Sequence, residues 1–183
     1  MWKVKIMKTN LSKAYIGIGA NLGEPVHNVL WAAKEIAKID GVIFSKLSSL
    51  YRTSPISSIP QPDYINAICA VSVSLPPGQL FLELQKIEKK IGKIPKTKED
   101  PRMIDLDLIA YDSIEVTLGQ LVIPHPMWKD RLFVLKPLSD LISVLKVGDR
   151  LYCIQDLIKQ FSNQKQLILE TIEPKETYDY AYN

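Results

Sequence analysis

The alternation of hydrophobic and polar residues predicts four strands and two helices in the part of the chain before residue 113. Strands are expected where apolar and β-branched residues dominate or alternate with polar ones, at residues 14–19, 42–54, 64–73 and 105–112. Apolar residues at helical spacing predict an amphipathic helix that begins at Pro25 and is stopped by Gly41. A second helix, marked by apolar residues from Leu80 to Ile91, closes at Gly92.

The order of these elements indicates the fold class. Strand, helix, strand, strand, helix, strand is the ferredoxin-like βαββαβ arrangement, an α+β fold in which both helices lie on one face of an antiparallel sheet. We expect one domain at residues 12–163, flanked by an N-terminal extension at residues 1–11 and a C-terminal extension at residues 164–183.

Beyond residue 112 the pattern is weaker, and it predicts a C-terminal helical extension of the core. The expected elements are short strands at residues 114–116 and 121–123, a helical region at residues 131–145 that is broken by Pro137, a short amphipathic helix at residues 154–161, and a weak last strand at residues 166–172.

Composition limits the classes of function. The chain has 183 residues, 46% hydrophobic and 23% charged, as is usual for a globular domain. It has no run of 18 apolar residues and no signal-peptide pattern after Met1, so a membrane partner is not expected. Cys69 and Cys153 lie in apolar contexts, which favours reduced thiols and a cytoplasmic location. A net charge of +3 does not indicate nucleic-acid binding. A monomer is expected.

The most informative residues are two carboxylates on the fourth predicted strand. Leu106 and Leu108 should point to the core, so Asp105 and Asp107 should share the other face, with their Cβ atoms about 6.5 Å apart. Like charges at that spacing repel each other, which suggests a nearby cation. The alternative is an edge strand whose charges prevent association with other chains.

Neighbouring residues favour magnesium and phosphate chemistry. Arg102 lies three residues before the acid pair, and a guanidinium binds phosphate through two parallel hydrogen bonds. His125 is held between two prolines in a loop after a strand, whereas His27 lies early in a helix and is a weaker candidate. The glycine-rich turn after residue 19 lacks the lysine of a P-loop, so a structural role is favoured there. Zinc is disfavoured by the cysteine and histidine spacing. Acids and basic side chains together indicate a phosphoryl-type transfer.

The segment at residues 101–108, Pro-Arg-Met-Ile-Asp-Leu-Asp-Leu, resembles the signature of the 6-hydroxymethyl-7,8-dihydropterin pyrophosphokinases, a family of folate-pathway enzymes. The similarity extends over about residues 14–141, in several separate segments that follow in the family's order. These further segments are residues 15–23, 49–55, 61–67, 124–126, 131–135 and 137–138.

The resemblance implies transfer of pyrophosphate from ATP to the hydroxymethyl group of the pterin, with release of AMP. It implies two Mg²⁺ ions held by Asp105 and Asp107, which together with Arg102 would form the catalytic group. The residues that it assigns to ATP are Glu88, Lys93, Lys98, Arg102, His125 and Arg131. The residues that it assigns to the pterin are Thr53, Ser54, Ile56, Tyr64, Asn66 and Phe133.

The chain departs from the family's pattern in the loop before Pro101. Lys93 and Pro95 stand where arginines are common, Glu99 and Asp100 stand where a tryptophan or a small residue is frequent, and the loop is slightly shorter. In the family this loop closes over the substrates, so the departure bears on turnover. Two alternatives remain: a catalytically weakened relative that binds pterin or nucleotide, and a ferredoxin-like RNA-binding module, although no strand carries the aromatic-rich RNA-binding pattern.

Overall fold

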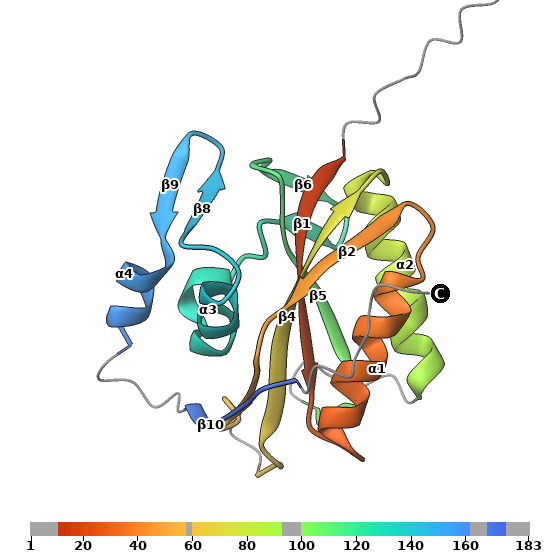
Figure 1. Cartoon of the computed structure of the whole chain (residues 1–183), viewed down its shortest axis with the longest axis vertical. Helices are drawn as coiled ribbons and strands as arrows, with labels where there is room; N and C mark the ends of the chain where they lie inside the picture. The colour runs from red at the N-terminus through yellow and green to blue at the C-terminus, as the bar shows by residue number, and fades with distance from the viewer. Residues whose placement is uncertain (1–10, 58–59, 93–99, 162–167, 175–183) are drawn as a thin grey trace, which may run out of the picture.

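A computed structural model of the protein describes residues 11–57, 60–92, 100–161 and 168–174. Its centre is an antiparallel sheet of six strands in the order β10-β3-β4-β1-β5, with β2 also paired to β4 (Figure 1). These strands are β1 (Ser12–Ala20), β2 (Val42–Leu47), β3 (Leu50–Thr53), β4 (Tyr64–Val73), β5 (Asp105–Tyr111) and β10 (Ile168–Ile172).

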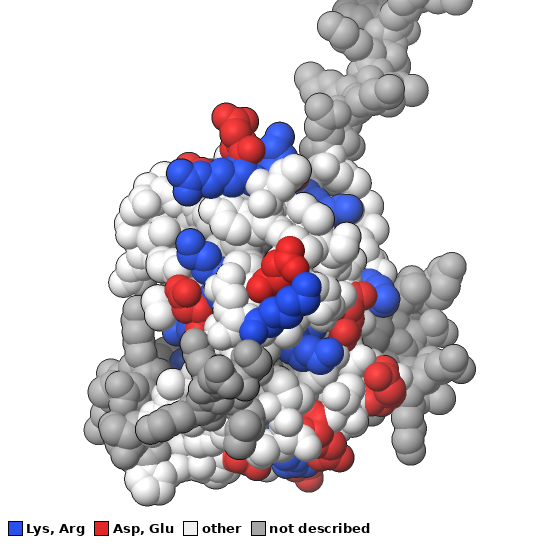
Figure 2. Space-filling view, turned by 90° about the vertical axis from the view of Figure 1, so that its left-hand side faces the viewer, with Lys and Arg blue, Asp and Glu red and all other residues white. Residues whose placement is uncertain are grey.

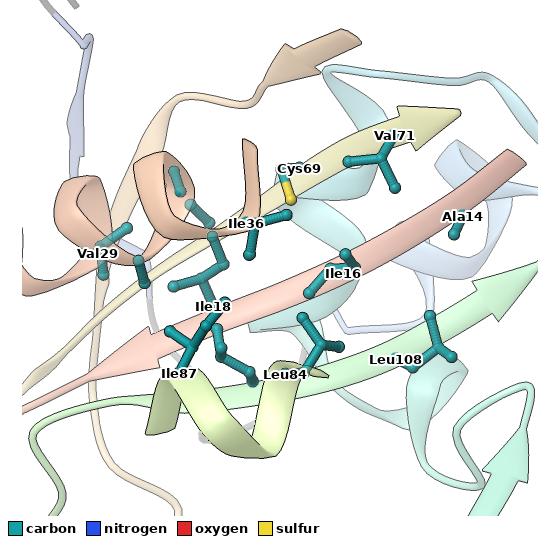
Figure 3. Packing of buried hydrophobic residues seen from close by; sticks show 14 of the residues in the cluster. Ala14, Ile16, Ile18, Val29, Ile36, Cys69, Val71, Leu84, Ile87 and Leu108 are labelled. Atoms are coloured by element: carbon teal, nitrogen blue, oxygen red, sulfur yellow. The ribbon is translucent and has the colours of Figure 1, made fainter. Parts of the chain in front are cut away.

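Two helices, α1 (Pro25–Ala37) and α2 (Pro77–Ile91), cover one face of this sheet (Figure 1). Both begin with proline in the first turn, where its missing N–H costs no hydrogen bond. Every second residue of β1 points to this side, and Ile16 and Ile18 pack there against Ile36 and Leu84 (Figure 3).

The opposite face is covered only in part, by α3 (Leu132–Ser139) and the elements around it. Tyr15, Ile68 and Ile109 form a second core with Leu135 and Leu138 of α3. The neighbouring elements are the hairpin β8 (Val144–Val147)–β9 (Arg150–Cys153), the 3-10 turn η1 (Trp128–Asp130) and the helix α4 (Ile154–Lys159). A further hairpin, β6 (Val116–Leu118)–β7 (Leu121–Ile123), adds Leu121 and Ile123 to the α1–α2 core. The candidate site lies beyond this second core, on the same face of the sheet.

The main elements match the prediction, but the expected strand at residues 42–54 is wrong as a single element. It is two strands, β2 and β3, separated at Ser48. The buried Ser48 hydroxyl accepts a hydrogen bond of 2.9 Å from the Ile68 amide. In a continuous strand pair that amide would donate to a backbone carbonyl, so this bond interrupts the ladder at Ser48. The helix expected to run to Gly41 ends at Ala37, and Gly41, with φ of +82°, turns the chain into β2.

The weaker C-terminal predictions are corrected in several places. The strand expected at residues 114–116 begins two residues later, as β6 at Val116–Leu118, and among the described residues it pairs with β7 in a separate hairpin. The helical region expected at residues 131–145 ends at Ser139, and its last residues belong to the hairpin β8–β9. Gly148, with φ of +54°, and Asp149 form the turn of that hairpin, a two-residue signal that the helical interpretation overlooked. The weak last strand exists as β10 and pairs with β3.

The helix lengths, the cysteines and the surface charges of the described residues are those of an ordinary globular chain. No helix in the described ranges is long and apolar enough to cross a membrane. Cys69 and Cys153 are both free, and burial raises the pKa of the Cys69 thiol to about 12. On the side shown in Figure 2, where α4 and β9 lie, basic side chains are interspersed with acidic ones.

The alternation of β1 predicts that truncating a side chain on its buried face costs much more stability than truncating an exposed side chain. Ile16→Ala should lower the free energy of unfolding by about 2–5 kcal/mol, because it leaves a cavity in the α1–α2 core. Ile43→Ala on β2, where the side chain is 56% exposed, should cost less than about 1 kcal/mol. Urea denaturation of both variants measures this, and equal losses would contradict the packing described.

Candidate active site

Asp105 and Asp107 lie on one face of β5, and β1 places a glycine opposite each of them. Gly19 pairs with Asp105, and Gly17 pairs with Asp107. Gly19 also pairs with Asn66 of β4, and a Cβ atom at Gly19 would lie 3.0 Å from the Asn66 Oδ1 atom. Asn66, Gly19 and Asp105 therefore form one row across three strands, with no side chain in its middle.

Arg102 neutralises Asp105. Its Nη1 atom lies 2.9 Å from the Asp105 Oδ1 atom, and only 10% of the Arg102 side chain is exposed. Burial acts to lower the pKa of the guanidinium, but Asp105, Tyr64 and Asp107 outweigh it and raise the pKa. Arg102 is thus a permanent cation beside the acid pair.

Asp107 faces two further basic side chains. The His125 Nε2 and Arg131 Nη1 atoms each lie 3.9 Å from the Asp107 Oδ2 atom. The His125 Nδ1 atom accepts a hydrogen bond from the Met127 amide over 3.2 Å, so the proton of a neutral imidazole is on Nε2, toward Asp107. The His125 amide donates to the Ile109 carbonyl over 2.9 Å, which fixes the loop to β5.

Glu88 of α2 supports the strand that carries the acids. Its Oε1 atom accepts a hydrogen bond of 2.8 Å from the amide of Leu106, the residue between Asp105 and Asp107. Burial, aided by the charges of Asp105 and Asp107, raises the pKa of Glu88 to about 7.

β5 lies at the edge of the main sheet, as the charged-edge alternative requires, but its two acids are paired with specific cations.

On the other side of Gly19, the residues assigned to the pterin surround a buried amide. The Asn66 Nδ2 atom donates to the Thr53 Oγ1 atom over 2.8 Å, and both residues are less than 10% exposed, at 7% and 3%. Tyr64 pairs with Thr53 across β3 and β4, and its hydroxyl donates to the Gln61 Oε1 atom over 3.0 Å. Three of the six assigned residues thus share one corner of the sheet.

The remaining assigned residues are placed less uniformly. Phe133 lies on α3, with the Arg131 guanidinium carbon 5.5 Å from the centre of its ring. Ser54 is half-buried, whereas Ile56 is 57% exposed. Lys93 and Lys98, together with the altered loop positions 95 and 99, lie outside the described residues.

The donor set fits a magnesium ion bound jointly with phosphate. Among the described residues, no group of three or more acid, histidine or cysteine side chains is arranged to hold a metal. Asp105 and Asp107 offer the carboxylate oxygens that Mg²⁺ prefers, and Mg²⁺ commonly completes its coordination with waters and substrate phosphates. The site therefore suits a metal that arrives with a phosphorylated substrate.

Sequence reasoning missed the residues that join the two halves of the site. Asn21, Asn28 and Gln61 make side-chain hydrogen bonds that connect segments 40 or more residues apart, such as Asn21 with Gln61 and Asn28 with Met103. The sequence signals were the position of Asn21 and Asn28 near the glycine-rich turn and the family-like segments at residues 15–23 and 61–67, which contain Asn21 and Gln61. Gly17 and Gly19 lie within β1, as the strand predicted at residues 14–19 requires.

Comparisons with known proteins identify the family to which the chain is similar. Residues 15–143 match the family model of 7,8-dihydro-6-hydroxymethylpterin-pyrophosphokinase (HPPK). A 2-amino-4-hydroxy-6-hydroxymethyldihydropteridine pyrophosphokinase of Haemophilus influenzae is 34% identical over 156 residues, covering 85% of this chain and 97% of that protein. The pyrophosphokinase of the same name from Synechocystis is 41% identical over 70% of this chain and 65% of its own length.

Longer proteins contain a similar region. The folic acid synthesis protein fol1 of Pneumocystis carinii is 42% identical over 69% of this chain, which spans only 17% of that protein. The crystal structure of a Plasmodium falciparum HPPK-DHPS triple mutant has a TM-score of 0.65 and 13% identity, covering 85% of this chain and 45% of the other. At that identity the structural likeness concerns the fold.

The pKa of Glu88 predicts how stability depends on pH. Because the folded pKa of about 7 lies above the ordinary glutamate pKa of 4.5, the folded state keeps a proton that the unfolded state releases between these values. Stability is therefore lost as the pH rises through this window. Glu88→Gln can still accept from the Leu106 amide, so it should gain about 1–2 kcal/mol relative to wild type between pH 5 and pH 8.

Urea denaturation at both pH values, in buffer without divalent cations, measures the Glu88 effect. Glu83→Gln, on the same helix, where the carboxylate pairs with Lys86 over 2.7 Å, is the matched control and should show no such change. If the difference in free energy of unfolding between Glu88→Gln and wild type is the same at both pH values, the raised pKa of Glu88 is contradicted.

Proposed function

This chain belongs to the 7,8-dihydro-6-hydroxymethylpterin-pyrophosphokinase family, and from that membership we propose that it makes the pterin diphosphate of folate synthesis. The transferred group is the pyrophosphoryl group of ATP, and the acceptor is the hydroxymethyl oxygen of 6-hydroxymethyl-7,8-dihydropterin. The oxygen forms a bond to the β-phosphorus, the bond between that phosphorus and the AMP oxygen breaks, and AMP leaves.

The observation that carries the proposal is the row across β4, β1 and β5. It joins a buried amide, suited to the polar edge of a heteroaromatic ring, to Asp105, the first of two carboxylates set among basic side chains. Gly19 adds no side chain between them, and a Cβ atom there would lie 3.0 Å from the Asn66 Oδ1 atom. A substrate with a flat polar ring and a reacting hydroxyl would reach from Asn66 over Gly19 toward Asp105.

The phosphate half of the site provides charge and positioning. Two Mg²⁺ ions, held by Asp105 and Asp107, would neutralise charge on the ATP phosphates. Arg102, Arg131 and His125 already surround the two acids within 4 Å, at 2.9 Å from Asp105 and 3.9 Å from Asp107. These three side chains would bind the phosphates of ATP, because phosphoryl transfer depends mainly on positioning and charge neutralisation.

The pterin half provides hydrogen bonds and stacking. The Asn66 Nδ2 atom donates to the Thr53 Oγ1 atom, which fixes the orientation of the amide, and its Oδ1 atom is a hydrogen-bond acceptor. Tyr64 and Phe133 would pack against the faces of the ring. Backbone groups at Thr53, Ser54 and Ile56 would bind the remaining polar atoms of the pterin.

Other features of the chain accompany this proposal. The strand order β3-β4-β1-β5, with α1 and α2 on one face, supports a ferredoxin-like core. The family match at residues 15–143 falls within the proposed domain at residues 12–163. We also propose a cytoplasmic monomer whose partners are ATP and the pterin rather than nucleic acid.

The direct test is formation of AMP. Incubated with ATP, Mg²⁺ and the hydroxymethyl pterin, the protein should release AMP only when the pterin is present. Asp105→Ala should lower kcat by about 100-fold or more, because charge neutralisation at the phosphates is lost. Asp156→Ala, an exposed acid on α4 outside the site, should retain wild-type activity.

Other outcomes of this assay decide between the alternatives. Release of ADP would contradict pyrophosphoryl transfer. Binding of pterin or ATP without AMP would identify a catalytically weakened relative. Tight, salt-sensitive RNA binding without AMP would identify an RNA-binding module.

Substitution of Asn66 tests the pterin half separately. Asn66→Ala should raise the pterin KM by about tenfold or more, because it removes a hydrogen-bonding group and leaves the Thr53 hydroxyl without its partner. The ATP KM should change by less than about twofold. Ser72→Ala, nearer the other end of β4, serves as the control, and an equal rise in both KM values for Asn66→Ala would show that Asn66 does not act on the pterin alone.

A further inference from the structure

Asn21 is a buried side chain that hydrogen-bonds to both of the segments assigned to the substrates. It is the first residue after β1 and is 2% exposed. The Oδ1 atom accepts from the Arg102 amide over 2.8 Å, while the Nδ2 atom donates to the Gln61 Oε1 atom over 2.9 Å and to the Pro62 carbonyl over 3.3 Å. One amide therefore connects the segment before β5 to the segment before β4.

The backbone around Asn21 strengthens the connection to Arg102. The amides of Asn21 and Leu22 both donate to the Arg102 carbonyl, over 3.1 and 3.2 Å. A second buried amide, Asn28 of α1, donates to the Leu22 and Met103 carbonyls over 3.0 and 3.1 Å. Residues 102 and 103 are thus fixed to the turn between β1 and α1 just before the acid pair.

Gln61 extends the network to the pterin half. Its Oε1 atom accepts from both Asn21 Nδ2 and the Tyr64 hydroxyl, over 2.9 and 3.0 Å. Arg102 in turn lies close enough to Tyr64 to influence its ionisation, and it pairs with Asp105 at 2.9 Å. Asn21, Gln61, Tyr64 and Arg102 therefore form a closed ring of neighbours between the two halves of the site.

We infer that Asn21 is a positioning residue. It holds the backbone of Arg102 and the segment of Gln61 in one fixed relation. The phosphate half and the pterin half of the site are therefore attached to the same side chain, which we call the shared junction. The inference rests on the proposed function for its kinetic consequence. Asn21 acts through Arg102 and Gln61 and need not touch either substrate. Its two ends act on different halves, which makes its role separable by substitution.

Steady-state kinetics of two variants test this separation. Gln61→Met removes only the pterin-side acceptor, so the pterin KM should rise by about tenfold while the ATP KM stays within about twofold of wild type. Asn21→Ala removes both connections, so both KM values should rise by about tenfold. Gln61→Glu retains an oxygen at the same place and should restore the pterin KM to within about threefold of wild type.

Hydrogen exchange of the Arg102 amide provides a readout without substrates. Asn21→Ala should reduce its protection by about tenfold or more, because Oδ1 of Asn21 is its acceptor, whereas Gln61→Met should leave it protected. Tyr111→Phe, which loses a buried hydrogen bond to the Leu75 carbonyl outside the site, controls for general destabilisation and should change neither the KM values nor this amide.

The outcomes separate the two proposals. If wild type releases no AMP but Asn21→Ala exposes the Arg102 amide, the function fails and the positioning role of Asn21 stands. If wild type is active and Asn21→Ala or Gln61→Met leaves both KM values unchanged, the inference is overturned. If Asn21→Ala fails to fold, the Gln61→Met variant tests the inference alone, because Gln61 is only partly buried. A pterin KM of Gln61→Met equal to that of wild type then refutes the shared junction.

Discussion

The antiparallel pairing of β1 with β4 on one side and β5 on the other is the interaction on which the site depends. It sets Gly19 opposite both Asn66 and Asp105, and it turns Leu106 into the α1–α2 core. Because side chains alternate across a strand, a register shift of one residue would exchange Leu106 for the acids and abolish both core and site. The same hydrophobic packing that stabilises the sheet therefore also selects the face on which the carboxylates appear.

Glycine in the interior of a strand is unfavourable, and β1 has two on the site face. Ile16 and Ile18, which alternate with these glycines, are 0% and 2% exposed on the other face and offset the weakness through burial. The two faces of β1 consequently differ: one supplies apolar area to the core, and the other carries no side chain at Gly17 and Gly19. A Cβ atom at Gly17 would meet the Ile109 side chain at 3.2 Å, so packing from β5 leaves little room beside it.

The sequence was informative where a feature repeats locally and uninformative where it depends on a distant partner. The periods of β1, β4, α1 and α2 were readable because burial of one face dictates them. The break at Ser48 depends on the amide of Ile68, and the role of Asn21 depends on residues 40 and 81 positions away, so neither has a local pattern. The acid pair was found from spacing and His125 from its place between two prolines. The assignment of His125 and Arg131 to ATP came through family resemblance, since no periodicity relates them to Asp107.

The pairing of β10 with β3 has a consequence for association with other molecules. Strand β3 is only four residues long and carries Thr53 at its end, and β10 covers its outer edge, with Arg52 and Glu170 paired at 2.9 Å across the two strands. An uncovered strand presents unpaired amides and carbonyls that other chains can extend. Strand β10, which is remote in sequence, occupies that edge and so prevents other chains from adding a strand beside Thr53. The Arg52–Glu170 pair lies where this edge of the sheet meets solvent.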